Sequence, residues 1–268
     1  MKVYCKLSDG LGNNLFRIAN AYSYSIKHNK ELLCDVSLKG SQHNPFSVYY
    51  NNFFRKLNLC NSTLNAVEYK HSGFEYYEIP KFKTDCYLNG LFQNEKYFVE
   101  GRDEILSLFE IDVNSLDYIN TKYGDILEQD TCSLHVRRGD YLAVSTILPV
   151  LNLEYYKNSV NEMGVDKIYL IFSNDVKWCE NNLNFIKNKI IIKDNPDFID
   201  LYLMSMCKNN IIANSSFSWW GAWLNKNKNK KVIGPKTWFG PDIVWWLIQN
   251  YNQPILKEEI IPLSWQKI

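Results

Sequence analysis

The sequence predicts an α/β fold made of two units, each with a parallel sheet. From Cys132 onward, short apolar strands alternate with segments of helical periodicity, which is the pattern of a parallel sheet with crossover helices. The N-terminus shows the same order of strand, loop and helix. A chain of 268 residues can bury one large or two modest cores. We therefore predict a first unit over residues 1–130 and a second over 131–268.

The first unit is predicted to begin with a strand at 3–6 and a glycine-containing turn at Leu11–Asn14, followed by an amphipathic helix. The start of this helix would favour an anion, and Gly12 would let a ligand approach the backbone closely. An ordinary strand-to-helix turn explains the pattern equally well. The next strand is expected at 31–36, and residues 40–131 are too irregular for more than scattered assignments.

The second unit is predicted element by element from its periodicity. Strands are expected at 132–138, 168–172, 190–192, 210–213 and 231–233, and helices at 153–163, 196–207 and 215–224. Asn195 and Pro196 suit a helix start, with asparagine as the cap and proline at the first helical position. The run Asn225–Lys231 indicates a solvated loop, with a weak contact to an anionic membrane as the alternative.

Composition and charge argue against several classes of function. The formal net charge is +1 and the pI is about 7.5, without the basic stripe expected of a nucleic-acid-binding protein. No apolar stretch approaches the length of a membrane span and no leader pattern is visible, so we expect a cytoplasmic protein. The 7 cysteines are scattered, without a Cys-x-x-Cys pair, which indicates neither a disulfide framework nor a zinc site. The 15% of aromatic residues is compatible with sugar recognition, although most rings are expected in the core.

The strand at 132–138 is the most informative segment, because it delivers several polar side chains together at its carboxyl end. Period-two alternation points His135 and Arg137 to the same side, while Arg138 and Asp140 fall where the strand gives way to a turn. Adjacent guanidinium groups suit a diphosphate, because each can grip phosphate oxygens bidentately. Open α/β sheets bind such ligands beyond the ends of their strands. A buried ion pair between an arginine and Asp140 is the alternative.

Two further segments place polar side chains where a ligand could bind. Asn174 and Asp175 follow the strand at 168–172, although they could equally cap the next helix. Asp200 lies in the first turn of its predicted helix. It could face a ligand, or it could only complement the helix dipole.

The segment Asn214–Ala222 gives the most specific signal. A strand ends in Asn214, Ser215 and Ser216, and a helix begins there, so hydroxyl groups and free amides converge on a site for an anion. The tryptophan pair that follows could belong to the core. Packing alone does not explain the polar turn.

Through these segments the chain resembles the α-1,2-fucosyltransferases of glycosyltransferase family 11 and, through them, the wider group of enzymes that use GDP-fucose. The matching segments follow one another in the expected order: Gly10–Phe16, His135–Tyr141, Phe172–Asp175, Asp200–Cys207 and Asn214–Trp223. Asn14 and Arg17 stand where the familiar form of the first turn has glutamine, which bears on the acceptor more than on the donor.

The resemblance implies an inverting, metal-independent transfer of fucose from GDP-fucose, on a GT-B fold of two facing Rossmann-like units. Residues 1–130 would lie on the acceptor side, and 131–268 would bind the donor. The acceptor would be a glycan, by resemblance the 2-hydroxyl of a terminal β-galactoside. No cofactor or metal is expected beyond the donor substrate itself.

The resemblance also implies roles for single residues. Arg137 would neutralise the β-phosphate, while His135 and Asp200 would contact the guanine end. The implied donor-binding residues are Asn13, His135, Arg137, Arg138, Asp200, Ser215 and Ser216, with Gly12, Asn174, Asp175 and Asn214 as possible support.

The chemistry of a leaving diphosphate favours Arg137 independently of the family. Negative charge develops on GDP as the glycosidic bond breaks, so a fixed guanidinium group stabilises the transition state more than the ground state. No Asp-x-Asp motif is present, and protein cations would then neutralise the leaving group. Asp140 is the first candidate for a general base and Asp175 the second. Asp140 could instead orient Arg138 through an ion pair.

Two alternatives remain open. Contacts to guanine and diphosphate do not identify the sugar, so the donor could be another GDP-activated sugar such as GDP-rhamnose. The aromatic content also allows a non-catalytic carbohydrate-binding protein, which would bind glycans without a nucleotide.

Overall fold

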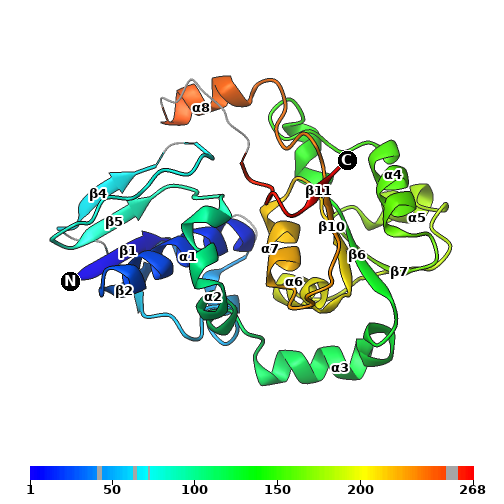
Figure 1. The fold of residues 1–268 in the computed structure, drawn as a ribbon, viewed down its shortest axis with the longest axis horizontal. Coiled ribbons are helices and arrows are strands. Elements are labelled where there is room, and N and C mark those ends of the chain that lie inside the picture. The colour runs from blue at the N-terminus through cyan, green and yellow to red at the C-terminus, as the bar shows by residue number, and fades with distance from the viewer. Residues whose placement is uncertain (41–43, 63–64, 72, 252–258) are drawn as a thin grey trace. The chain divides into compact units, whose positions relative to one another are not determined.

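The chain folds into two α/β units, each built around a parallel sheet (Figure 1). The computed structural model describes residues 1–40, 44–62, 65–71, 73–251 and 259–268. The first unit comprises Met1–Asp112 and Leu247–Pro262, and the second comprises Val113–Trp246 and Leu263–Ile268. The α/β class with two parallel sheets is therefore confirmed.

The units divide after Asp112, whereas the sequence pattern suggested a boundary near residue 130. The difference comes from α3 (Val113–Leu127), a helix that the sequence left unassigned. It packs against α6 (Asp197–Met206) and so belongs to the second unit. The division also passes through α8 (Ile243–Tyr251).

The first unit contains a five-stranded sheet in the order β3-β2-β1-β5-β4. Its strands are β1 (Lys2–Lys6), β2 (Glu31–Asp35), β3 (Leu59–Cys60), β4 (Val67–Lys70) and β5 (Cys86–Asn89). Its helical segments are α1 (Leu11–Lys27), η1 (Phe46–Tyr49), η2 (Glu95–Tyr97), η3 (Val99–Gly101) and α2 (Arg102–Leu108). Strands β2 and β3 extend to one side of β1, and β5 and β4 to the other, so the strand order reverses between β1 and β5.

Helix α1 forms because its apolar residues recur every three or four positions. Leu11, Leu15 and Ile18 are fully or almost fully buried, so this face packs on β1 and β2. The predicted turn at Leu11–Asn14 is wrong, because these residues form the first turn of α1 and Gly10 is the N-cap.

The second unit contains a six-stranded sheet in the order β11-β10-β9-β6-β7-β8. Its strands are β6 (Thr131–Val136), β7 (Ile168–Ser173), β8 (Lys189–Ile191), β9 (Asn209–Ile211), β10 (Val232–Gly234) and β11 (Gln266–Lys267). Besides α3 and α6, its helical segments are η4 (Gly139–Ala143), α4 (Leu153–Met163), α5 (Val176–Asn182) and α7 (Ser216–Leu224).

Strand β6 lies inside this sheet between β9 and β7, and all of its residues are buried. Strands β7 and β8 follow on one side of it, and β9, β10 and β11 on the other, so the strand order reverses between β6 and β9. Ligands of open α/β sheets bind beyond the carboxyl ends of the strands at such a reversal. The tryptophans of α7 are core residues, since Trp219, Trp220 and Trp223 are almost completely buried.

The strands and helices predicted for the second unit are present close to their expected positions. The predicted cap is wrong: α6 begins at Asp197, Pro196 occupies the cap position, and the side chain of Asn195 bonds to Asp200. Within the described ranges, no helix is long and apolar enough to cross a membrane.

Candidate active site

The carboxyl ends of β6, β7 and β9 bring together most of the site residues predicted in the second unit. In the parallel register, His135 of β6 lies opposite Phe172 of β7, and Leu134 lies opposite Ile211 of β9. The three strands therefore end at one edge of the sheet. This edge contains the reversal between β6 and β9, which favours it as the ligand site.

Arg137 follows β6 and is held by Asp140. Its Nη2 lies 2.7 Å from Asp140 Oδ2, and its guanidinium carbon lies 5.4 Å from the ring centroid of Tyr141. The other oxygen of Asp140, Oδ1, accepts a hydrogen bond from Asn174 Nδ2 at 3.1 Å. Asn174 in turn accepts one from the backbone N–H of Arg138 at 3.0 Å. The end of β7 therefore fixes the carboxylate that orients Arg137.

Arg138 has a separate set of contacts. Its Nε lies 3.3 Å from Asp175 Oδ2, and its guanidinium carbon lies 4.4 Å from the ring centroid of Trp178. Asp175 Oδ1 also accepts a hydrogen bond from the backbone N–H of Trp178 at 3.1 Å and so caps α5. The alternative in which Asp140 orients Arg138 is wrong, because Asp140 pairs with Arg137 and Asp175 pairs with Arg138.

His135 is buried and neutral. It is 4% exposed, and burial, assisted by the charge of Arg137, lowers its pKa to about 3. Its ring centroid lies 5.8 Å from that of Phe217 in the first turn of α7. In the part of the chain that the structure describes, His135 Nδ1 and Arg137 Nε are buried without a hydrogen-bond partner. Such atoms cost free energy unless a ligand satisfies them.

Asn214 and Ser215 lead into α7. The hydroxyl of Tyr141 donates to the backbone carbonyl of Asn214 at 2.9 Å, and Asn214 Nδ2 donates to two backbone carbonyls at 2.9 and 3.1 Å. Ser215 is the N-cap residue, but its side chain makes no capping hydrogen bond. Ser216, the first residue of α7, is partly exposed. The rigid turn therefore presents the first amides of α7 to an anion.

Asp200 of α6 belongs to a different network. Its Oδ1 accepts a hydrogen bond from Asn195 Nδ2 at 3.0 Å. Asn195 is held in turn by three side chains of α3, those of Tyr118, Lys122 and Tyr123. Burial raises the pKa of Asp200 to about 7, with Asp197 adding to the rise and the Asn195 bond and Lys122 opposing it. No hydrogen bond among the described residues joins Asp200 to the β6 edge.

Gly12 and Asn13 lie in the first turn of α1, in the other unit. Asn13 Oδ1 accepts a hydrogen bond from Gln93 Nε2 at 2.8 Å. Gln93 lies beyond β5, so this contact spans the reversal between β1 and β5.

Asn14 and Arg17 fix the loop that precedes α1. Asn14 is buried and donates to the backbone carbonyl of Asp9 at 2.7 Å. Arg17 pairs with the carboxylate of Asp9 and donates through Nε to the carbonyl of Gly90 at 3.1 Å. Asn14 and Arg17, which stand where the familiar form of this segment has glutamine, therefore stabilise the loop before α1.

The sequence profile of glycosyl transferase family 11 matches residues 50–242. The chain belongs to glycosyl transferase family 11. The O-antigen biosynthesis glycosyltransferase WbnK of Escherichia coli is 31% identical to it over 88% of this chain and 95% of its own length. The alpha-1,2-colitosyltransferase of Escherichia coli is 31% identical over 88% of this chain and 92% of its own length. The chain is thus a glycosyltransferase, and the non-catalytic alternative is set aside.

More distant proteins share part of the sequence or the fold of this family 11 chain. Galactoside alpha-(1,2)-fucosyltransferase 1 of Saimiri boliviensis boliviensis is 26% identical over 34% of this chain and 28% of its own length. The fucosyltransferase NodZ from Bradyrhizobium is 14% identical, with a TM-score of 0.54 over 82% of this chain and 92% of its own. The family 9 glycosyl transferase of Veillonella parvula is 8% identical, with a TM-score of 0.50 over 87% of this chain and 80% of its own. The expected GT-B-like, Rossmann-like fold class is confirmed.

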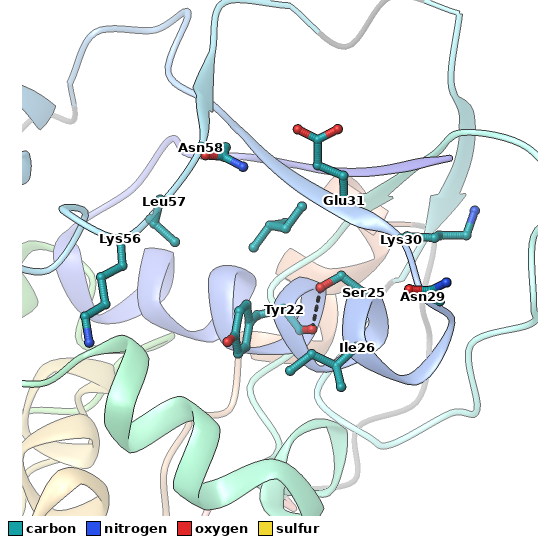
Figure 2. Close-up of a pocket in the computed structure, with 10 residues that line it drawn as sticks. Tyr22, Ser25, Ile26, Asn29, Lys30, Glu31, Lys56, Leu57 and Asn58 are labelled. Carbon is teal, nitrogen blue, oxygen red and sulfur yellow. Dashed lines mark hydrogen bonds between the residues drawn. The ribbon is translucent and has the colours of Figure 1, made fainter.

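An open pocket of about 470 Å³ in the first unit of the family 11 chain is lined by none of these residues. Figure 2 shows its lining from three segments: Tyr22, Ser25 and Ile26 of α1, Asn29–Leu32 at the start of β2, and Lys56–Asn58 before β3. These segments lie at the amino ends of β2 and β3. Because ligands of such sheets bind at the carboxyl ends, we do not assign the transfer reaction to this pocket.

The structure adds three residues to the family 11 site that sequence reasoning missed. Tyr141 and Trp178 lie beneath the guanidinium groups of Arg137 and Arg138. Asn195 holds the carboxylate of Asp200. Tyr141 ends the segment His135–Tyr141, and its closeness to Arg137 in the sequence is a feature from which a contact between the two side chains could be predicted. Nothing in the sequence marks Trp178 or Asn195 as neighbours of the site.

Proposed function

We propose that the chain transfers fucose from GDP-fucose to a glycan hydroxyl with inversion, and that the hydroxyl is the 2-hydroxyl of a terminal β-galactoside. The observation that carries the proposal is the fixed guanidinium group of Arg137 at the strand reversal, 2.7 Å from Asp140 and above Tyr141. The hydroxyl of Tyr141 donates a hydrogen bond to the turn that starts α7. The guanidinium group of Arg137 and the first amides of α7 would therefore bind the same anion.

The diphosphate of the donor would bind at this edge of the second unit. Arg137 would contact the β-phosphate, and Ser215 and Ser216 with the first amides of α7 would bind the remaining phosphate oxygens. Arg138 would contribute charge, although its pairing with Asp175 and its position over Trp178 suit it to holding the loop.

The guanine end would be recognised by His135 and Asp200. A carboxylate can accept two hydrogen bonds from guanine, from N1–H and from the 2-amino group. Asn195 holds this carboxylate through a 3.0 Å hydrogen bond, which supports a role in which its orientation matters. His135 is neutral, so its Nδ1 can accept or donate depending on the tautomer.

In the proposed step, the bond between sugar carbon 1 and the β-phosphate oxygen breaks, and GDP leaves with the electron pair. The acceptor oxygen forms the new bond to carbon 1 from the opposite face, and its proton passes to a base or to water. Arg137 stabilises the negative charge that develops on GDP, so the reaction needs no metal ion. Asp140 and Asp175 are both engaged with arginines, so we assign them to positioning.

The relatives support a second candidate donor. The alpha-1,2-colitosyltransferase covers most of this chain, whereas the galactoside alpha-(1,2)-fucosyltransferase covers a third of it. Fucose and colitose differ only at carbon 3, where colitose lacks the hydroxyl group. Among the structural relatives, NodZ has been soaked with GDP-fucose. We therefore propose GDP-fucose as the first donor and GDP-colitose as the alternative.

The test is a donor panel with one acceptor. Purified protein is incubated with lactose and GDP-fucose, GDP-colitose, GDP-rhamnose or GDP-mannose, and released GDP and the product linkage are measured. We expect lactose-dependent release with GDP-fucose and an α-1,2-linked product by NMR. Faster release with GDP-colitose identifies the alternative donor. No release with any GDP-sugar contradicts the proposed donor class.

A further inference from the structure

Two exposed tyrosines stand at the carboxyl edge of the first unit's sheet, which nothing above assigns to a ligand. Tyr76 is 38% exposed and Tyr77 is 49% exposed, and both follow β4. We call this pair the tyrosine platform. Strand β4 neighbours β5 (Figure 1). The segment after β5 carries Gln93, whose side chain donates a hydrogen bond to Asn13. The platform and Asn13 therefore lie at the same edge of the first unit's sheet.

Buried groups hold the tyrosine platform from beneath. The hydroxyl of Tyr97 accepts a hydrogen bond from the backbone N–H of Tyr77 at 3.1 Å and donates one to the carbonyl of Glu75 at 3.3 Å. The Tyr97 ring also lies 4.9 Å from the ring of Tyr76, centroid to centroid. Exposed rings that are fixed in advance lose little entropy on binding, which suits them to a ligand.

A second layer of rings supports this arrangement. His71 stacks on Phe92 with a centroid distance of 5.0 Å, lies 5.9 Å from the ring of Tyr77, and has its Nε2 3.0 Å from the carbonyl of Glu75. Burial lowers the pKa of His71, which favours the neutral form of the ring. Phe92 has φ of 51°, a left-handed conformation that costs a non-glycine residue free energy. Such a conformation persists where surrounding contacts stabilise it. Here it places the ring of Phe92 against His71, beneath the tyrosine platform.

Glu75 places a carboxylate beside the rings of the tyrosine platform. The residue is 6% exposed, and its Oε2 accepts a hydrogen bond from the hydroxyl of Tyr77 at 3.0 Å. None of the residues that the structure describes donates to its other oxygen, Oε1. A carboxylate with one oxygen fixed and the other available can accept a hydrogen bond from a sugar hydroxyl.

We propose that Tyr76, Tyr77 and Glu75 bind a pyranose ring of the acceptor glycan. The C–H face of a pyranose packs on aromatic rings, while its hydroxyl groups need charged or polar acceptors at the rim. The tyrosine platform and Glu75 supply both. This inference rests on the proposed function, because the glycan is an acceptor only if the chain is a transferase of that kind.

The experiment measures lactose binding to the full chain by saturation-transfer NMR, beside GDP binding by calorimetry. Tyr76→Ala and Tyr77→Ala are compared with the wild type and with Tyr50→Ala, a control in the same unit with the same 38% exposure as Tyr76. We expect both platform variants to weaken lactose binding about tenfold or more. Tyr50→Ala and the conservative Tyr76→Phe are expected to keep it. Glu75→Gln is expected to weaken it while leaving GDP affinity unchanged.

Three results would overturn the platform: no lactose binding by the wild type, equal lactose binding in all variants, or a loss of lactose binding in Tyr76→Phe as large as in Tyr76→Ala. Failure of the proposed function has a different signature. Wild-type protein that binds lactose through the platform but binds no GDP would leave the sugar site supported and would contradict the donor site.

Discussion

Asp140 lies between Arg137 and Asn174, with Oδ2 2.7 Å from Arg137 Nη2 and Oδ1 3.1 Å from Asn174 Nδ2. Both carboxylate oxygens are therefore engaged. Asn174 also accepts the backbone N–H of Arg138, so one side chain at the end of β7 fixes the loop that carries both arginines. Asp140 is thereby suited to positioning the guanidinium group of Arg137.

Replacement of Asn174 tests this arrangement. Asn174→Ala removes the hydrogen bond that holds Asp140, so Arg137 should lose its fixed orientation while keeping its charge. We expect kcat to fall about tenfold to a hundredfold, with a smaller change in the KM of the donor. Steady-state kinetics of GDP release provide the measurement.

The matched control for this variant is Asn184→Ala. Asn184 is exposed, and within the described ranges its side chain donates one local hydrogen bond, to the carbonyl of Asn181 at 3.3 Å. Its kinetics should match those of the wild type. If Asn174→Ala also has wild-type kinetics, the orientation of the Asp140 carboxylate does not depend on the hydrogen bond from Asn174.

Gly139 offers an independent test of the same contact. A Cβ atom added there would lie 2.6 Å from Asn174 Nδ2 and 3.1 Å from its Cγ. Gly139→Ala should therefore displace the Asn174 side chain and lower kcat as Asn174→Ala does. Gly124→Ala is the control, since among the described residues no atom beyond its chain neighbours and the backbone of its own helix lies within 4 Å of the added Cβ. An unimpaired Gly139→Ala enzyme would show that the Asn174 contact is dispensable.

Asp200 makes stability depend on pH. Its folded pKa of about 7 is raised above the ordinary value of 3.8, so the folded protein keeps a proton that the unfolded chain releases between these values. Wild-type stability contributed by this group is therefore lost as pH rises toward about 7. Asp200→Asn removes the loss, so its melting temperature relative to the wild type should rise between about pH 4 and about pH 7 and then level off.

The exposed Asp166→Asn is the control for this pH dependence. The same substitution at Asp200 should weaken GDP binding, because an amide replaces the carboxylate acceptor proposed for guanine. A melting-temperature difference between Asp200→Asn and the wild type that stays constant with pH would show that Asp200 is not protonated in the fold.

Metal independence follows from the proposed role of Arg137. Because a guanidinium group and the amides of α7 neutralise the leaving GDP, EDTA should leave the rate of GDP release unchanged. The measurement compares release with and without EDTA and after addition of Mg²⁺. A loss that Mg²⁺ restores would contradict this part of the account.

The β6 edge could be predicted from the sequence because its signal is local. The buried strand β6 ends at Val136, with His135 just before this residue and Arg137 just after it, and parallel packing then determines which edge they occupy. The same reasoning placed Asn174 and Asn214 at that edge. The partner of Asp140 could not be chosen this way, because Arg137 and Arg138 are adjacent and their directions depend on packing.

Other features could not be predicted because they depend on contacts between distant segments. Asn195 looks like a helix cap, but tyrosine hydroxyls of α3, more than seventy residues earlier, bind its side chain. Strand β4 escaped notice because it is a short edge strand with mostly exposed residues. The sequence predicts a turn where α1 begins, because Gly12 is a residue typical of turns and lies in the first turn of this helix.

The central claim is that Arg137 stabilises a leaving GDP at the β6 edge. The direct measurement is lactose-dependent GDP release from GDP-fucose by the wild type and by Arg137→Ala, with GDP affinity determined for both. The account predicts that release falls about a hundredfold or more in the variant, while GDP affinity falls much less. A variant that releases GDP at the wild-type rate, or a wild type that binds no GDP, would contradict it.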